Sequence, residues 1–144
     1  MMLTLICTLN ALIFTALGGL HLYWMGGGRW GLRQALPSTP SGAPLFQPGL
    51  VACAVVGVGL MGFAVFWAML ASGEPLPFGA GRWGTWASAA IFSLRAVGDF
   101  RYVGLFRRVR DTDFGRMDGR WYTPLCVYLG LSSAYAGWLT GHVH

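Results

Sequence analysis

The chain has 144 residues, of which 55% are hydrophobic and only 10% are charged, and its formal net charge is +5. A soluble domain carries about 25% charged residues. The composition therefore excludes an ordinary soluble domain, and the long apolar stretches are typical of a membrane protein.

The first long apolar stretch predicts a transmembrane helix over about residues 2–24. About 22 residues at 1.5 Å per residue extend about 33 Å, which is enough to cross the hydrocarbon core of a bilayer. Asn10 and His21 are spaced so that they share one face of this helix. Trp24 marks its membrane interface. Residues 25–49 follow as a loop, because this segment holds a Gly-Gly-Gly run and four of the seven prolines.

The second apolar stretch predicts a transmembrane helix over residues 50–71 that carries no charge. Its small-residue pairs four positions apart, such as Cys53 with Gly57, favour close packing between helices.

The third apolar stretch predicts a helix over residues 83–106 with two charges inside it. Arg95 lies near its middle and Asp99 follows one turn later, so an ion pair along the helix is expected. A charge within a bilayer needs a protein or water partner. The pair can be a structural clamp or part of a ligand-binding or catalytic site, and the sequence leaves both interpretations open.

An arginine-rich loop over residues 107–120 precedes the fourth predicted span, at residues 121–140. We therefore predict an all-α membrane protein with a single domain over residues 1–144. Its four transmembrane helices form an up-down-up-down bundle. The loops after the first and third spans carry most of the arginines, so the positive-inside rule places both loops in the cytoplasm. Both termini then lie on the non-cytoplasmic side.

This orientation predicts a polar cluster near the cytoplasmic ends of the helices. Its candidate members are His21, Trp24, Arg95, Asp99, Tyr102 and Tyr122. Arginines beside the third span are candidates for binding lipid head groups. These are Arg101, Arg107, Arg108 and Arg110. The pattern assigns no catalytic residue and no cofactor. The three cysteines form no C-x-x-C motif, so no metal site is expected.

Four segments together resemble a known bacterial family. They are H-L-Y-W at 21–24, R-A-V-G-D-F-R-Y-V-G at 95–104, F-R-R-V-R-D-T-D-F at 106–114 and Y-T-P-L-C at 122–126. The resemblance is to small four-helix integral membrane proteins classed as a domain of unknown function. It implies the four-span fold and a multi-pass location in the bacterial inner membrane. It implies no activity, so it assigns no catalytic residues.

Three roles follow from these features. The first is an accessory subunit that packs against another membrane protein or a second copy, because the loops are short and the helices carry small-residue faces. The second is a lipid- or isoprenoid-binding protein or enzyme with a cytoplasm-facing polar pocket. A proton or ion pathway ranks last, because the outer halves of the spans offer few polar groups. Anionic membrane lipids are expected partners and nucleic acids are not.

Overall fold

The structure, a computed structural model, describes residues 1–74 and 76–142, and most of these residues fold into helices. The elements are α1 (Met2–Met25), α2 (Leu32–Ala35), α3 (Leu50–Ser72), η1 (Pro77–Gly79), α4 (Ala80–Val97), α5 (Asp113–Met117), η2 (Asp118–Tyr122) and α6 (Thr123–His142). Within these residues no β-strand occurs, and the only β-type pairing is an isolated bridge between Ser38 and Pro44. The predicted all-α class is confirmed.

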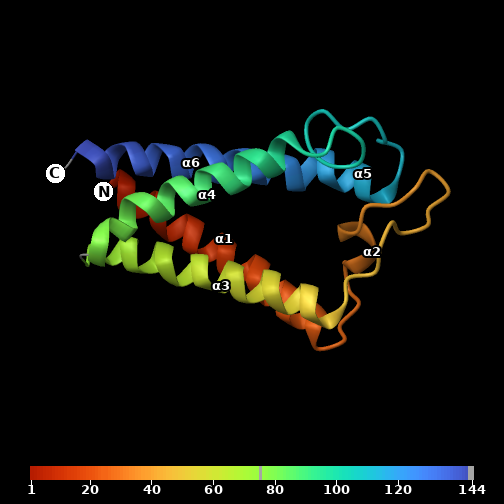
Figure 1. The fold of residues 1–144 in the computed structure, drawn as a ribbon, viewed down its shortest axis with the longest axis horizontal. Coiled ribbons are helices and arrows are strands. Elements are labelled where there is room, and N and C mark those ends of the chain that lie inside the picture. Colours follow the sequence, from red (N-terminus) through yellow and green to blue (C-terminus); the bar gives the residue numbers. More distant parts are fainter. Residues whose placement is uncertain (75, 143–144) are drawn as a thin grey trace.

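Four long helices run the length of the molecule as two antiparallel pairs (Figure 1). Helix α1 packs mainly against α3, and α4 packs mainly against α6. Met1 and the end of α6 lie at one end of the molecule, whereas α2 and α5 lie at the other end (Figure 1). The two pairs diverge toward the end that carries α2 and α5, which we call the loop end.

Aromatic residues hold the two pairs together. The ring of Phe14 on α1 lies 5.3 Å from that of Phe63 on α3 and 5.1 Å from that of Phe92 on α4, measured between centroids. The amide of Asn10, fully buried on α1, donates to the Ser132 hydroxyl on α6 at 3.2 Å. This bond satisfies a polar group that would be costly to bury alone. Asn10 therefore lies in the core of the helical bundle.

Helices α1 and α3 are long and apolar enough to cross a membrane. Their 24 and 23 residues extend about 36 and 34 Å at 1.5 Å per residue. Their outer faces expose large apolar side chains, with 67% of Leu5 and 72% of Val51 accessible. Soluble proteins rarely leave such continuous apolar surface in contact with water. The first two predicted spans are thus confirmed as helices of membrane-spanning length and composition.

The predicted helix over residues 83–106 is wrong at its C-terminal end, because α4 ends at Val97. The reason is Gly98, whose φ of +82° lies in the left-handed region that glycine adopts readily. Apolar periodicity continues into the next residues and therefore does not reveal this end. Residues 98–112 instead form an irregular segment that folds back over α4 and α6, and we call it the arginine loop.

Candidate functional site

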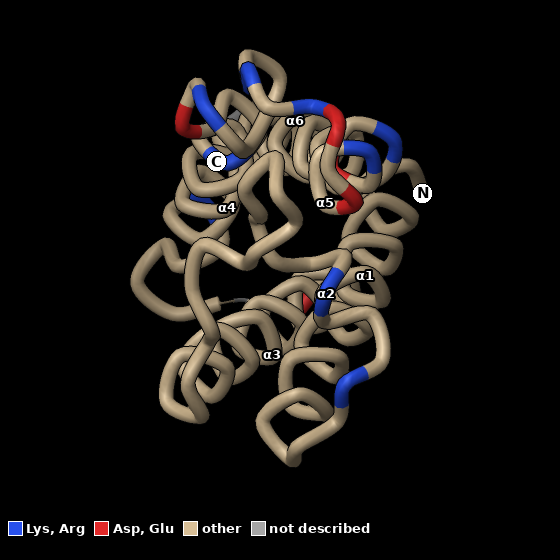
Figure 2. Tube along the Cα trace, turned by 90° about the vertical axis from the view of Figure 1, so that its right-hand side faces the viewer, with Lys and Arg blue, Asp and Glu red and all other residues tan. Residues whose placement is uncertain are grey.

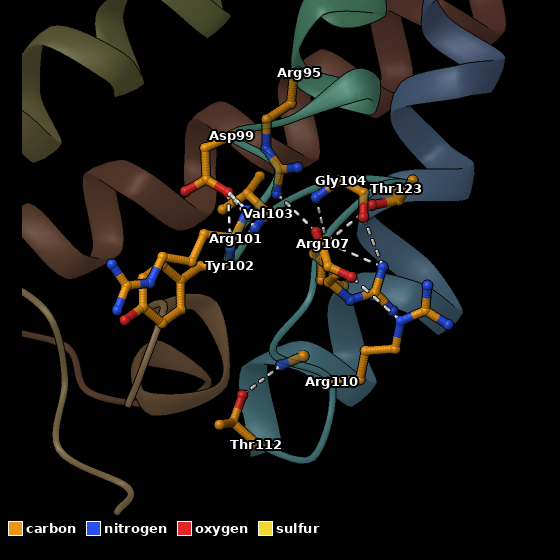
Figure 3. Close-up of polar contacts among 12 residues, drawn as sticks. Arg95, Asp99, Arg101, Tyr102, Val103, Gly104, Arg107, Arg110, Thr112 and Thr123 are labelled. Carbon is orange, nitrogen blue, oxygen red and sulfur yellow. Dashed lines mark hydrogen bonds and ion pairs between the residues drawn. The ribbon is translucent and has the colours of Figure 1, made fainter. Parts of the chain in front are cut away.

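The arginine loop begins with a tight turn organised by Asp99. One oxygen of this carboxylate, Oδ1, accepts hydrogen bonds from the backbone N–H groups of Arg101, Tyr102 and Val103 at 2.7–2.9 Å (Figure 3). Burial acts to raise the pKa of the Asp99 carboxyl. The backbone hydrogen bonds from Val103, Arg101 and Tyr102 outweigh it and hold this pKa below its usual value. Asp99 therefore remains ionised and shapes the backbone of the turn.

A fully buried carboxylate, Asp118, lies at the centre of the loop end. Arg95 on α4 donates from Nη2 to Asp118 Oδ1 at 2.8 Å. The other oxygen, Oδ2, accepts from the Gly104 backbone N–H at 2.9 Å and from the Thr123 hydroxyl at 3.0 Å. Asp118 thus joins α4, the arginine loop and the start of α6 at one point. We call Asp118 and its four partners, Arg95, Gly104, Arg107 and Thr123, the Asp118 hub.

Arg107 is the second cation of the hub, and its side chain is only 12% exposed. Its Nη1 donates to the Gly104 carbonyl oxygen at 2.8 Å and lies 3.6 Å from Asp118 Oδ2. Gly119 makes room for this guanidinium, because a Cβ at that position would overlap Nη2 of Arg107. The hub therefore depends on a residue without a side chain beside a large buried cation.

A π-helical turn, η2, sets the geometry of the hub at Asp118. In this turn the Thr123 N–H bonds to the carbonyl oxygen of Asp118, five residues back. The wider turn brings the Thr123 side chain within reach of the Asp118 carboxylate, which an ordinary α-helical turn would not favour. Such single π-turns are frequent at functional sites.

The hub engages most of the acceptor positions of the Asp118 carboxylate. A carboxylate offers about four acceptor positions. Here Arg95, Gly104 and Thr123 donate to it directly while Arg107 approaches as an ion-pair partner. A general base must have a vacant acceptor within reach of the proton that it removes. The geometry therefore suits a structural anchor that fixes the arginine loop.

The predicted ion pair between Arg95 and Asp99 is wrong, because Arg95 pairs with Asp118. Asp99 lies beyond the end of α4, so the two residues do not share a helix face. The charge of Arg95, whose side chain is 32% exposed, is nevertheless paired. Its partner is a different acid from the one that the sequence predicted.

Two other members of the predicted polar cluster, His21 and Trp24, lie apart from the hub. The His21 ring packs edge-on against Trp24 on α1, with centroids 4.9 Å apart, and its Nδ1 lies 2.8 Å from the Leu17 carbonyl oxygen. Trp24 donates to the Trp30 carbonyl oxygen at 2.8 Å. Within the described residues, neither side chain has a hydrogen bond or ring contact with α4 or α6. These two residues organise the end of α1.

The two predicted tyrosines lie in different segments, Tyr102 within the arginine loop and Tyr122 next to Thr123 of the hub. Tyr102 lies in the turn after α4, where the Arg101 guanidinium lies 5.1 Å from its ring centroid. Tyr122 is in η2, and its ring centroid lies 6.1 Å from that of Phe114. Neither hydroxyl has a hydrogen-bond partner among the residues that the structure describes.

The four arginines predicted to bind head groups divide into two kinds. Arg107 is turned inward to the Asp118 hub, and Arg110 donates from Nε to the Arg107 carbonyl oxygen at 3.3 Å. Arg101, Arg108 and Arg110 are exposed, and their charges have no ion-pair partner in the part of the chain that the structure describes. These three therefore present charges that are free to meet a membrane surface.

Charged residues concentrate at the loop end of the molecule. Figure 2, viewed from this end, shows most of them on the chain between α4 and α6 and a smaller basic group near α2. Between these two groups lies a pocket of about 700 Å³, with residues from Arg29 to Pro48 on one side and from Asp111 to Arg116 on the other. We call it the loop-end pocket.

Comparison with known families decides the classification of the chain. A family model described as "Protein of unknown function (DUF3995)" matches residues 14–133. The chain belongs to the DUF3995 family. The match spans α3, α4, the arginine loop and the Asp118 hub, so this DUF3995 protein carries all of these within the family region. No curated protein and no solved structure matches the chain.

Asp118 is the central residue of this DUF3995 site, and sequence reasoning missed it. Asp111, Asp113 and Asp118 all fall in one polar segment, and local spacing does not single out any of them. One signal was available: Asp118 is the aspartate nearest the fourth apolar stretch, where an unpaired charge would be costly. That cost implies a cationic partner, and Arg95 is the arginine nearest the middle of the preceding span.

Proposed function

We propose that this DUF3995 protein is a multi-pass protein of the bacterial inner membrane in which α1, α3, α4 and α6 all cross the bilayer. The apolar outer faces of α1 and α3 support this proposal, since lipid is the solvent that such surfaces match. Helix α4 has 18 residues and extends about 27 Å. The exposed side chains of Phe100, Leu105 and Phe106 in the arginine loop suit the membrane interface next to its end.

The distribution of arginines supports an orientation with the loop end in the cytoplasm. Arg29, Arg33 and the basic residues of the arginine loop lie at that end, whereas Arg82 lies near the start of α4 at the opposite end. The positive-inside rule then assigns both termini to the non-cytoplasmic side.

Within that membrane, we propose a non-enzymatic role as a subunit that packs against another transmembrane helix. The observation that carries this role is an apolar groove of about 510 Å³ between α3 and α4. Its lining combines small residues, Gly59 and Gly62 on α3 and Ala80, Gly84 and Ala87 on α4, with the aromatic residues Phe63, Phe66 and Trp83. Small residues allow helix backbones to approach closely within membranes, where van der Waals packing drives association.

Two glycines of the groove, Gly59 and Gly62, are not needed for close packing against other described residues of the chain. A Cβ added to Gly59 or Gly62 would meet no atom within 4 Å, whereas one added to Gly18 would lie 2.8 Å from the Met61 sulfur. A glycine inside a helix costs about 1 kcal/mol relative to alanine. Packing between α1 and α3 offsets that cost at Gly18, and a partner helix would offset it at Gly59 and Gly62.

The double substitution Gly59→Leu/Gly62→Leu tests the subunit role. We expect it to fill the groove and to reduce the fraction of assembled protein at least fivefold, because a partner backbone can no longer approach. Native mass spectrometry of mildly extracted protein measures the assembled fraction. Gly19→Leu is the control, since it adds the same side chain to an open position on α1. Equal assembly by the double variant and the wild type, or a protein that is a bare monomer throughout, would refute the role.

A second candidate function is binding of a lipid or isoprenoid-like molecule, and the loop-end pocket favours it. Its volume of about 700 Å³ falls in the range of small-molecule sites, about 300–1,000 Å³. Because three donors and the Arg107 guanidinium already engage the Asp118 carboxylate, we propose binding without chemistry.

A further inference from the structure

The loop-end pocket contains cations that have no ion-pair partner among the residues that the structure describes. Arg29 and Arg33 line it, and neither has an ion pair or a side-chain hydrogen bond among the described residues. Arg116 lines it too, paired with Asp113 at 3.0 Å. That pair is 70% and 65% exposed, and exposed pairs of this kind contribute little energy. Its guanidinium is therefore available to a competing anion.

The wall that carries Arg29 and Arg33 is ordered by its own hydrogen bonds. Gly31 adopts a φ of +72°, and the Leu32 N–H donates to the Arg29 carbonyl oxygen at 3.2 Å. The Trp24 indole then ties this turn to α1 through the Trp30 carbonyl oxygen. The two arginines therefore start from a fixed backbone, which reduces the entropic cost of binding.

The rest of that wall is a compact loop. Leu45 N–H donates to the Pro37 carbonyl oxygen at 2.9 Å, and Thr39 N–H donates to that of Ala43 at 2.8 Å. The prolines of this segment further restrict the unbound chain. A pocket of this kind keeps its shape in the free protein and does not need a ligand to form.

The opposite wall is fixed as firmly. The Thr112 hydroxyl caps α5 by accepting from the Gly115 N–H at 2.9 Å. Gly115 in turn lies against the Arg110 backbone, where a Cβ would be 2.8 Å from the carbonyl oxygen. This wall also presents the unpaired carboxylate of Asp111 to the pocket. The pocket thus offers three guanidiniums, those of Arg29, Arg33 and Arg116, and two carboxylates, of which that of Asp113 is paired with Arg116.

We propose that the loop-end pocket binds a phosphate-bearing group, with Arg29 and Arg33 as its primary contacts and Arg116 as an exchangeable third. Guanidinium forks match phosphate oxygens in geometry and charge. Two sources share this chemistry, a phospholipid head group at the membrane surface and a soluble phosphomonoester. The proposal rests on the second candidate function and specifies its ligand.

Titration of the detergent-solubilised full chain with two probes tests the site. Dihexanoyl phosphatidic acid represents the lipid source and glycerol 3-phosphate the soluble one, and tryptophan fluorescence reports binding next to Trp30. We expect Arg33→Gln to weaken binding of the preferred probe at least fivefold and Arg29→Gln/Arg33→Gln at least twentyfold. Arg120→Gln, which removes one exposed charge at the same end but outside the pocket, should change it less than twofold.

Each outcome of this titration has a defined meaning. Tighter binding of the lipid probe identifies a membrane head group as the source, and tighter binding of glycerol 3-phosphate identifies a soluble one. Equal weakening of binding by Arg33→Gln and Arg120→Gln would overturn the proposal. It would show that binding depends on the net charge of this end of the molecule and not on the pocket. Lack of binding by either probe to wild-type protein would overturn it too. Neither result would bear on the proposed membrane placement or on the proposed subunit role. The measurement of the assembled fraction tests the subunit role separately.

Discussion

Asp118→Asn is expected to destabilise the protein by about 3–5 kcal/mol, the usual cost of removing one partner from a buried ion pair. The substitution is nearly isosteric but leaves Arg95 without a counter-charge and turns an amide N–H₂ toward a donor of the hub. Since Asp118 joins α4, the arginine loop and α6, its loss should loosen all three. Chemical unfolding in detergent, followed by tryptophan fluorescence, measures the change.

Asp99→Asn is the matched control for this prediction. It removes the same charge from the same end of the molecule, but its side-chain oxygen can still accept from the backbone N–H groups that Asp99 now binds. A loss of about 1 kcal/mol or less is expected. Losses of equal size in the two variants would contradict the central position of Asp118.

Gly98→Ala should cost about 3 kcal/mol or more, because two penalties combine at this residue. Its φ of +82° is unfavourable for alanine, and a Cβ there would overlap the carbonyl oxygen of Val103. Gly104→Ala should behave alike, with φ of +90° and a Cβ only 2.5 Å from the Val97 carbonyl oxygen. The two glycines lie against each other where the arginine loop crosses the end of α4. The same unfolding measurement applies.

Gly27→Ala is the control for Gly98→Ala, because it separates the cost of a positive φ from the cost of steric overlap. Gly27 has a φ of +93°, but a Cβ there would meet nothing within 4 Å. Only the conformational penalty remains, about 1–2 kcal/mol. If Gly98→Ala and Gly27→Ala cost the same, then close packing of the arginine loop on α4 contributes nothing to stability.

The sequence predicted the long helices well because hydropathy and length are properties of the local chain. The spans placed at 2–24 and 50–71 correspond to α1 (Met2–Met25) and α3 (Leu50–Ser72). The end of α4 was missed because it depends on one glycine followed by an aspartate that turns to accept backbone N–H groups. Gly98 is one of 22 glycines in the chain, and composition does not distinguish it from those inside helices.

The ion-pair partner of Arg95 could not be predicted from the sequence for a different physical reason. Asp99 is four residues from Arg95, which is the spacing of an ion pair along a helix, whereas Asp118 is 23 residues away. The choice between them requires the arginine loop to fold back, which depends on Gly104, Arg107 and Thr123 acting together. The rule for side-chain pairs four residues apart applies within a continuous helix, but α4 ends at Val97, between Arg95 and Asp99.

Cysteine labelling of intact and lysed cells with a membrane-impermeant maleimide tests the proposed membrane topology most directly. Ser41→Cys, Phe78→Cys and Arg120→Cys place one exposed probe in each of three connecting segments. The native cysteines are buried, so the unsubstituted chain provides the background. We predict labelling of Phe78→Cys in intact bacterial cells with a permeable outer membrane, and labelling of Ser41→Cys and Arg120→Cys only after lysis. Labelling of all three positions from the same side would contradict a chain that crosses the bilayer through α3 and α4.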